Sequence, residues 1–373
     1  METPSGQLIS QSLLDNEEAL FSQVLSSRSA FVDRTHTTSP QAAFALVRRW
    51  ALKAGVTRLA EATRVDRIGI PVTYAVRPAA VHPTSVVAMG KGTKYTEACL
   101  SALFESFERW ALEEAAVTQH PDDPNRAETV GFDMVSRTAV KIPLWRAVFP
   151  GLIAGARFPA DTHGAAASTN PAAAVYNALL EIIERRVTST LKADSGDRVP
   201  IEVISGPPRP LAETFASAGI QLEMRLISFE FVHVAYVLSR DLHLSNRTLL
   251  CSGACAHPSA ETALVGALCE VAQSRIAMIL ALREDLAQNV QRRASGVIPH
   301  EIVSMWFEND TRPIPSIPIS HTCATTIESA LINLVTDAAK WFRDFHPVAV
   351  RLRAFGALVA FRVIDYQTVQ PDV

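Results

Sequence analysis

Pairs of polar side chains recur at one spacing in three separate segments of the sequence. Each segment has a Glu followed three residues later by Glu or Gln, and the segments read ACLSALFESFER, AVYNALLEIIER and ALVGALCEVAQSR. On a helix, residues three and four positions apart share one face, so each segment would present its polar pair together. Clustered carboxylates repel one another and take up protons unless cations neutralise them. The repeat therefore favours cation binding.

Three helix faces carry the repeated polar residues. They consist of Ser101, Glu105 and Glu108; Asn177, Glu181 and Glu184; and Gly266, Glu270 and Gln273. Their apolar neighbours predict partial burial, and Mg2+ shared between carboxylates and phosphates would supply the missing positive charge. Arg185 and Arg275 could add more. The alternative is that each polar pair lies on a solvent-exposed helix face with local ion pairs. This alternative explains a single copy of the pattern better than it explains three copies.

Glycines precede each of the three segments, as Gly90-Lys91-Gly92, His163-Gly164 and Gly253-Ala254. They predict a turn before each helix, where backbone amides favour a phosphate and Lys91 adds a point charge. A plain strand-to-helix turn explains any one of these glycines equally well.

Several neighbouring side chains invite a chemical role but have simpler explanations. His163 and His257 are candidate general bases, although loop histidines are more often hydrogen-bonding residues. Cys251, Cys255 and His257 form half of a zinc pattern, and no second half follows. Ala at fixed positions in each copy predicts that some other segment approaches the helix backbone closely.

Composition narrows the class of protein. The 373 residues are 48% hydrophobic and 20% charged, with a net charge of -3, which is typical of a globular chain without a nucleic-acid-binding field. The N-terminus lacks the features of a secretory signal, and apolar runs such as Ile276 to Leu282 fall short of a membrane span. With five cysteines, an odd number, we expect a reduced, cytoplasmic protein without a membrane partner.

Periodicity predicts the elements that must position these residues. We expect helices and strands in an α+β arrangement. No Walker or Rossmann glycine motif occurs, so a nucleotide site would be unconventional. The predicted helices are 41–53, 93–114, 171–191, 210–218, 259–283 and 326–345; the predicted strands are 68–76, 85–89, 201–204, 221–229, 231–238 and two at the C-terminus; irregular stretches cover 121–124 and 312–318.

The three segments resemble the hallmark blocks of the YcaO family. The blocks read GKGTKYTEACLSALFESFER, HGAAASTNPAAAVYNALLEIIER and GACAHPSAETALVGALCEVAQSR, and TRVDRIGIPVTYAVRP resembles a block of members that act with a TfuA partner. The resemblance implies a YcaO-like fold, with antiparallel sheets packed against long helices around a central nucleotide site. It also implies ATP and Mg2+ as cofactors, and conversion of backbone amides in ribosomally made, bacteriocin-like peptides into azolines or thioamides.

The resemblance also implies which residues form the site. Position by position, the nucleotide contacts would be Lys91, Ser101, Glu105, Glu108, Thr169, Glu181, Glu184, Arg185, Glu270, Gln273 and Arg275, and the metal ligands Glu105, Glu108, Glu181, Glu184 and Glu270.

Some positions of this sequence depart from the family pattern. Ser168-Thr169 stands where Gly-Asn is usual, and Ala173 where Glu is usual, so one nucleotide contact and one carboxylate are expected to be missing. Asn170 and Asp161 are candidates to compensate. The Arg34 to Thr37 stretch and the Gln370 to Val373 tail also differ from the pattern of many members.

The resemblance suggests a division of the chain and a set of partners. Residues 1–64 are predicted to be a helical region that is a candidate contact for a leader peptide or partner, and residues 65–373 an ATP-binding domain. The partners implied are a precursor peptide and a TfuA-like, leader-binding or dehydrogenase protein; a homodimer stays open. Two alternatives remain: a YcaO-like scaffold with weakened ATP use, and another amide ligase, which no motif favours. The catalytic group is not predicted.

Overall fold

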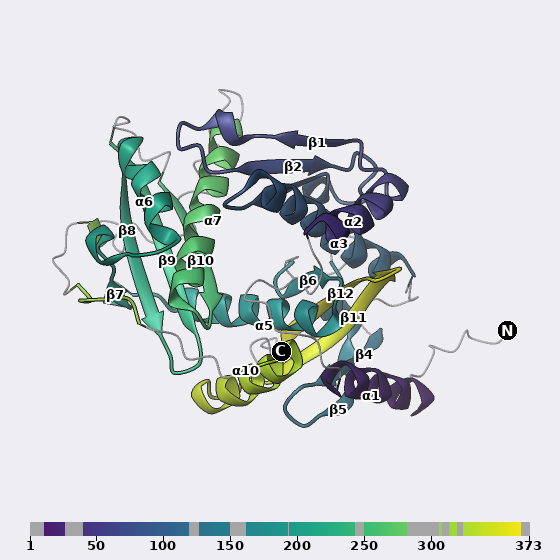
Figure 1. Ribbon diagram of the computed structural model, residues 1–373. Helices are drawn as coiled ribbons and strands as arrows, with labels where there is room; N and C mark the ends of the chain where they lie inside the picture. Colours follow the sequence, from purple (N-terminus) through teal and green to yellow (C-terminus); the bar gives the residue numbers. More distant parts are fainter. Residues whose placement is uncertain are drawn as a thin grey trace.

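The computed structural model describes residues 11–26, 40–118, 127–149, 162–192, 194–242, 250–281, 306–307, 313–318 and 324–366. The 34–37, 121–124 and 370–373 stretches and Asp161 lie outside the described residues. The molecule has three antiparallel sheets, and the helices α5 (Pro171–Thr188) and α7 (Ala260–Ala281) lie between them (Figure 1). This α+β arrangement confirms the predicted fold class.

The first sheet has the order β1-β2-β3 and is backed by α2 and α3. Pro40 opens α2, where its missing amide costs no helical hydrogen bond. The sheet ends at an edge strand, β3, which leads directly into α3. The elements are α2 (Pro40–Lys53), β1 (Arg58–Glu61), η1 (Thr63–Val65), β2 (Val72–Val76), η2 (Pro83–Ser85), β3 (Val87–Lys91) and α3 (Tyr95–Thr118).

The second sheet has the order β5-β4-β11-β12-β6 and packs against α5, which α10 covers in turn. Asn170 caps α5 through its side-chain oxygen, and Thr326 forms a capping box with Ser329 at the start of α10. The elements are α1 (Gln11–Ser26), β4 (Glu128–Asp133), β5 (Thr138–Pro143), α4 (Leu144–Ala147), β6 (Ala165–Ser168), α5 (Pro171–Thr188), α10 (Ile327–Trp341), β11 (Pro347–Phe355) and β12 (Leu358–Asp365).

The third sheet has the order β10-β9-β8-β7, with α6 and α7 on one face. The predicted strand 201–204 is wrong, because this stretch forms the 3-10 helix η4 after Pro200, whose nitrogen cannot donate to a ladder. The elements are β7 (Asp197–Arg198), η4 (Ile201–Val203), α6 (Pro208–Ser217), β8 (Ile220–Ser228), β9 (His233–Asp241), β10 (Cys251–His257) and α7 (Ala260–Ala281).

Each of the helices α3, α5 and α7, which we call the signature helices, contributes to a different apolar core. The α5 core includes α10, the α3 core includes α2, and the α7 core includes α6. Helix α7 is long and apolar enough to cross a membrane, unlike the short runs considered in the sequence. Of its apolar window, 56% is buried, as is common for a core helix.

Glycines in two edge strands let the signature helices approach. Gly90 lies in β3 and Gly253 in β10, so the predicted turns at these two positions are wrong. A Cβ on Gly90 would lie 2.0 Å from the Ala102 nitrogen, and one on Gly253 would lie 2.4 Å from the Ala267 oxygen. The close approach predicted from the repeated Ala positions is thus confirmed for α3 and α7.

We expect Gly90→Ala to lower the free energy of unfolding by about 3 kcal/mol or more, because the new methyl group collides with the backbone of α3. Urea denaturation would measure this loss. The control is Gly55→Ala, since Gly55 has φ +75° and open space around it and should cost only about 1–2 kcal/mol of backbone strain. Equal losses in the two variants would contradict the close approach.

The N-terminal region is joined to the rest of the chain. Strand β1, which lies within residues 1–64, pairs with β2 beyond them, and Glu18 of α1 accepts a hydrogen bond from the Ala139 amide in β5. Helix α2 packs on α3. A role for this region in binding a leader peptide stays a prediction at this point.

Candidate functional site

The polar faces of the three signature helices meet. Glu105 and Glu181 act electrostatically on Glu108, and Glu270 acts on both Glu181 and Glu184. The acidic residues that the sequence placed in three distant segments therefore form one cluster, which we call the glutamate cluster: Glu105, Glu108, Glu181, Glu184 and Glu270.

Helix α3 contributes Glu105 and Glu108 to the cluster, and contacts with neighbouring groups hold both side chains in place. Glu105 pairs with Arg109 at 2.7 Å, and Arg109 also donates hydrogen bonds to the carbonyls of Thr84 and Val87. Glu108 accepts a hydrogen bond of 2.8 Å from the Ala167 amide in β6. The first and second signature segments are thereby joined through backbone and side-chain contacts.

Helix α5 contributes two carboxylates and one guanidinium. Glu181 accepts a hydrogen bond of 3.1 Å from the Gly164 amide, whose residue has the left-handed φ of +72°. Arg185 lies 3.7 Å from both Glu181 and Glu184 and is 42% exposed. Glu184 is buried, and its Oε1 atom has no hydrogen-bond partner. A buried carboxylate oxygen in this state is a ready acceptor for a cation.

Lys91 connects the first signature segment to the third. Its Nζ atom lies 3.1 Å from Glu270 Oε2, so the lysine expected to meet a phosphate is paired here with a carboxylate of α7. Burial alone would lower the pKa of Lys91, but the carboxylates of Glu270 and Glu184 raise it. The lysine is therefore held in its charged form inside the cluster.

The structure adds two residues that the sequence did not single out for the site. Tyr236 on β9 lies within the electrostatic reach of Glu270, Arg185 and Glu184, and Cys255 on β10 lies within that of Glu184 and Lys91. Burial raises the pKa of both side chains, which keeps them neutral. Only strand pairing brings them here, and their own segments carry no signal beyond alternation.

The cluster holds protons at neutral pH. Burial, followed by the charge of Glu270, raises the pKa of Glu184 to about 8. Burial also raises the pKa of Glu181 to about 7, with Glu105 and Glu270 adding to it, and the pKa of Glu108 lies well above its usual range for the same reasons. Such carboxylates favour any cation that replaces the protons.

The donor set suits Mg2+ with a phosphate ligand. Oxygen ligands predominate, and Lys91 and Arg185 supply positive charge for phosphates beside them. Among the described residues, no three His, Cys, Asp or Glu side chains form a ready-made metal cage. Mg2+ commonly binds through one or two carboxylates together with phosphate oxygens rather than through such a cage.

We expect the ligand-free protein to lose stability as the pH rises from 4.5 to about 8. Glu181 and Glu184 keep their protons in the folded state up to about 7 and about 8, whereas they ionise near 4.5 when unfolded. The folded state therefore binds more protons in this window, and its stability falls with rising pH. Urea midpoints measured across the window would show this fall.

The variant Glu184→Gln should flatten that pH dependence, and Mg2+ with a nucleotide should reduce it. Glu213→Gln is the control, since Glu213 is an exposed partner of Arg209 and should leave the slope unchanged. A stability that stays level or rises between these pH values would contradict the raised pKa values in the cluster.

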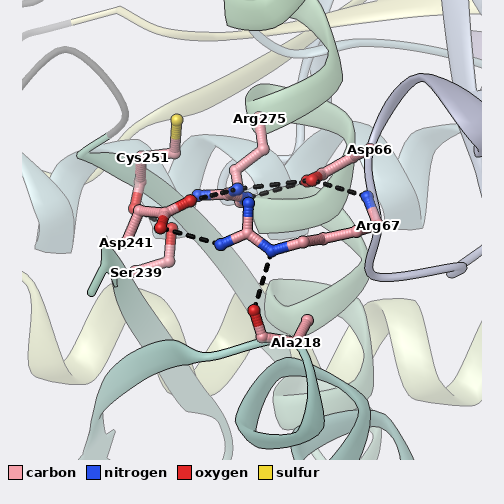
Figure 2. A network of polar contacts seen from close by, with 7 residues as sticks. All are labelled: Asp66, Arg67, Ala218, Ser239, Asp241, Cys251 and Arg275. Atoms are coloured by element: carbon pink, nitrogen blue, oxygen red, sulfur yellow. Dashed lines mark hydrogen bonds and ion pairs between the residues drawn. The ribbon is translucent and has the colours of Figure 1, made fainter. Parts of the chain in front are cut away.

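Arg275 does not join the glutamate cluster through any contact that the structure shows. Its guanidinium is fully buried and lies 2.8 Å from Asp66 and 3.2 Å from Asp241 (Figure 2). Arg67 pairs with the same Asp241 at 2.7 Å and donates to the Ala218 carbonyl. The network joins the loop before β2 to β9 and α7, which gives Arg275 a structural role, and the nucleotide contact of Arg275 stays a prediction.

The remaining predicted site positions differ in burial and in the contacts that they make. Ser101 and Gln273 are half-buried on α3 and α7, and Thr169 is half-buried just after β6. Asn170 is engaged in capping α5, and Ala173 is fully enclosed in an apolar core. No carboxylate therefore comes from position 173, and Asn170 is not placed to replace one.

The histidine and zinc hypotheses gain no support in the described part of the chain. His257 accepts a hydrogen bond from the Ser259 amide at the start of α7, and His163 is exposed. Cys251 lies beside the Arg275 network, whereas Cys255 lies beside Glu184. The two thiols thus belong to different environments on one strand.

A family model and several relatives match most of this chain. A family model described as YcaO cyclodehydratase, ATP- and Mg2+-binding, matches residues 115–364. A protein of Methanothermobacter thermautotrophicus is 32% identical over 68% of this chain and 74% of its own, and a Rhizobium leguminosarum protein named for the tfuA 3' region is 26% identical over 81% and 80%.

Solved structures share the fold. A YcaO protein from Methanopyrus kandleri bound with AMPPCP and Mg2+ has a TM-score of 0.71 at 21% identity, covering 91% of this chain and 94% of that one. A heterocyclase in complex with substrate and cofactor also has a TM-score of 0.71, at 14% identity, covering 90% of this chain and 53% of that one. An Escherichia coli microcin synthetase complex has a TM-score of 0.58 at 14% identity, with 82% and 87% coverage.

Proposed function

This chain belongs to the YcaO family of ATP- and Mg2+-binding cyclodehydratases, and on that premise we propose that it activates backbone amides of a ribosomally made peptide, giving azolines or thioamides. The observation that carries the proposal is the glutamate cluster. Three signature helices from three separate cores bring five carboxylates together, and burial raises the pKa of three of them, Glu108, Glu181 and Glu184, so that a cation would replace their protons. A structural relative with this fold was bound with AMPPCP and Mg2+.

In the proposed site, the carboxylates would bind Mg2+ and the cationic side chains would bind the phosphates. Glu108, Glu181 and Glu184 would hold Mg2+, together with Glu105 and Glu270. Lys91 and Arg185, already placed among these carboxylates, would contact the phosphates. Arg109 would act indirectly by holding Glu105 in place. Once a cation neutralises the cluster, the protons now held by Glu181 and Glu184 are released to solvent.

Bound ATP and Mg2+ would supply a phosphoryl group that converts the amide oxygen, a poor leaving group, into phosphate. For an azoline, a Cys, Ser or Thr side chain of the peptide adds to the amide carbon, and the peptide loses one water overall. For a thioamide, sulfide adds and sulfur replaces the oxygen. Both reactions consume one ATP and release ADP and phosphate. The described site residues do not distinguish the two.

The test uses the purified chain, the precursor peptide encoded beside its gene and the neighbouring partner proteins. We expect phosphate release that depends on the peptide, and a peptide whose mass changes by loss of water or by exchange of oxygen for sulfur. Absence of phosphate release under these conditions, with partners present, would overturn the proposal.

A second candidate is a scaffold subunit of a peptide-maturation complex. Ala173 favours it, because this buried position supplies no carboxylate where the family usually has Glu. The scaffold would bind the precursor peptide and its partners without peptide-dependent release of phosphate. Calorimetric titration with ATP and Mg2+, beside the phosphate assay, separates the two candidates.

We extend the proposal to partners and location. A TfuA-like protein is a candidate partner because a relative of this chain is named for the tfuA 3' region; a leader-binding or dehydrogenase protein is the other. Cys99, Cys251, Cys255 and Cys269 are free thiols, which suits a reducing cytoplasm. Co-purification with a tagged TfuA-like protein would test the first partner.

A further inference from the structure

Strand β1 is the terminal strand of the sheet β1-β2-β3, and within the described residues no strand pairs with its outer edge. The Ala62 amide donates to the Val72 carbonyl at 2.8 Å, which sets the alternation along the antiparallel ladder. The backbone groups of Ala60 therefore point to β2, whereas those of Leu59 and Glu61 point away from the sheet. Such a row of unpaired donors and acceptors is a template for another strand.

An apolar cavity lies beside this edge. Its volume is about 160 Å³, and its lining includes Phe44 of α2, Leu59 of β1 and Leu103 of α3. Leu52 lies at the same cavity with 71% of its surface exposed. An apolar cavity of about 150 Å³ accommodates a benzene-sized group in another protein. One aliphatic or aromatic side chain of an added strand would fit.

The charges around the cavity select the partner. Arg48 and Arg58 line it, and the described lining contains no carboxylate. An acidic partner gains attraction from these two arginines. Glu61 at the other end of β1 would repel it, so the acidic residues belong near Arg58. In a second copy of the chain, paired about a two-fold axis, the Arg58 end of one β1 would lie beside the Glu61 end of the other, so a dimer through this edge is an outcome that the test must separate.

We infer that the edge of β1 binds an extended, acidic segment of the precursor peptide by strand addition, with one apolar side chain in the cavity between α2 and α3. The identification of the partner as a precursor peptide rests on the proposed function. Main-chain hydrogen bonds to Leu59 and Glu61 supply affinity, and the cavity and arginines supply selectivity.

Helix α3 connects the cavity to the glutamate cluster. The helix carries Leu103 in the cavity and Glu105 in the cluster, and residues two positions apart on a helix are about 200° apart around its axis. The binding edge and the reacting site therefore lie on different sides of one helix. A peptide held at β1 would present its downstream part at a raised effective concentration.

The test measures fluorescence anisotropy with the full chain and no ATP. The probe is a fluorescein-labelled peptide with one leucine between glutamates at one end and serines and threonines at the other. Two comparison peptides have lysines for the glutamates, or backbone N-methyl groups at alternate residues. We expect both to bind at least about tenfold more weakly. Equal binding of the N-methylated peptide would overturn strand addition.

A matched pair of variants tests the charges. Arg48→Glu should weaken binding of the acidic peptide about tenfold or more, whereas Arg49→Glu, an exposed neighbour outside the cavity lining, should change it little. Equal effects of the two variants would overturn the inference. Gel filtration of the peptide-free chain adds a further check, because a dimer broken by Arg48→Glu would assign the edge to a second copy.

The two proposals fail differently. If the acidic peptide binds as expected but no phosphate is ever released, the proposed function fails and the peptide site stands. If the chain releases phosphate with its precursor while Arg48→Glu and Arg49→Glu have the same KM for that precursor, the site is overturned and the function stands. In the expected result, Arg48→Glu raises KM for the precursor and leaves kcat near its original value.

Discussion

Replacing Glu184 with Gln is expected to lower peptide-dependent phosphate release by about 100-fold or more, because it removes a charged ligand at the centre of the cluster. Glu184 is buried, lies 3.7 Å from Arg185 and has one oxygen without a hydrogen-bond partner. The amide keeps the shape of the side chain but has no negative charge to offer Mg2+. Phosphate release and the mass of the product peptide are the measurements.

The same variant should be as stable as the original chain or more stable without ligand. Because the pKa of Glu184 is about 8, the amide replaces a carboxyl that is largely protonated at neutral pH, and at higher pH it removes a charge held beside Glu270 and Glu181. Glu213→Gln, in an exposed pair, is the control for both activity and stability. Retained turnover in Glu184→Gln would remove this residue from the site, and loss of folding would contradict the electrostatic interpretation of the cluster.

The variant Arg275→Met is expected to lower the free energy of unfolding by about 3–5 kcal/mol, which is a large part of the stability of a protein domain. Arg275 is fully buried between Asp66 and Asp241 (Figure 2). Its removal takes away the buried charge that faces both aspartates, while Arg67, which is 42% exposed, still pairs with Asp241. Urea denaturation measures the loss.

Arg67→Met is the matched control. It removes one arginine partner of Asp241, while Arg275 continues to pair with the same aspartate. We expect it to cost less than about 2 kcal/mol. At a temperature where Arg275→Met is still folded, its KM for ATP should match that of the original chain. A large rise in KM with little loss of stability would support the predicted nucleotide contact.

The contacts of Arg275 show what the sequence could not reveal about a predicted site residue. Its position in the third signature segment matches that of a nucleotide contact, yet Arg275 turns to Asp66 and Asp241, far away in the sequence. The choice depends on which carboxylate lies nearest once β9 and α7 pack together. Helical spacing gives the face of a residue but not the element that it meets.

Other differences also come from packing between elements. Gly90 and Gly253 looked like turn residues, but they are strand residues chosen because α3 and α7 pack with almost no gap. Three of the four residues 201–204 are apolar and β-branched, as in a strand, but Pro200 ends the pairing to β8. Strand registers placed Tyr236 and Cys255 at the cluster, which no local pattern revealed.

The sequence by itself determined the three signature helices, their polar faces and the α+β class, because a repeated spacing defines a helix face wherever the chain goes. It also carried the resemblance to the YcaO family. The tertiary structure alone decided that Lys91 pairs with Glu270 and that burial raises the pKa of Glu184. Those outcomes depend on distances and burial between three separate cores, and neither quantity exists until the helices have packed.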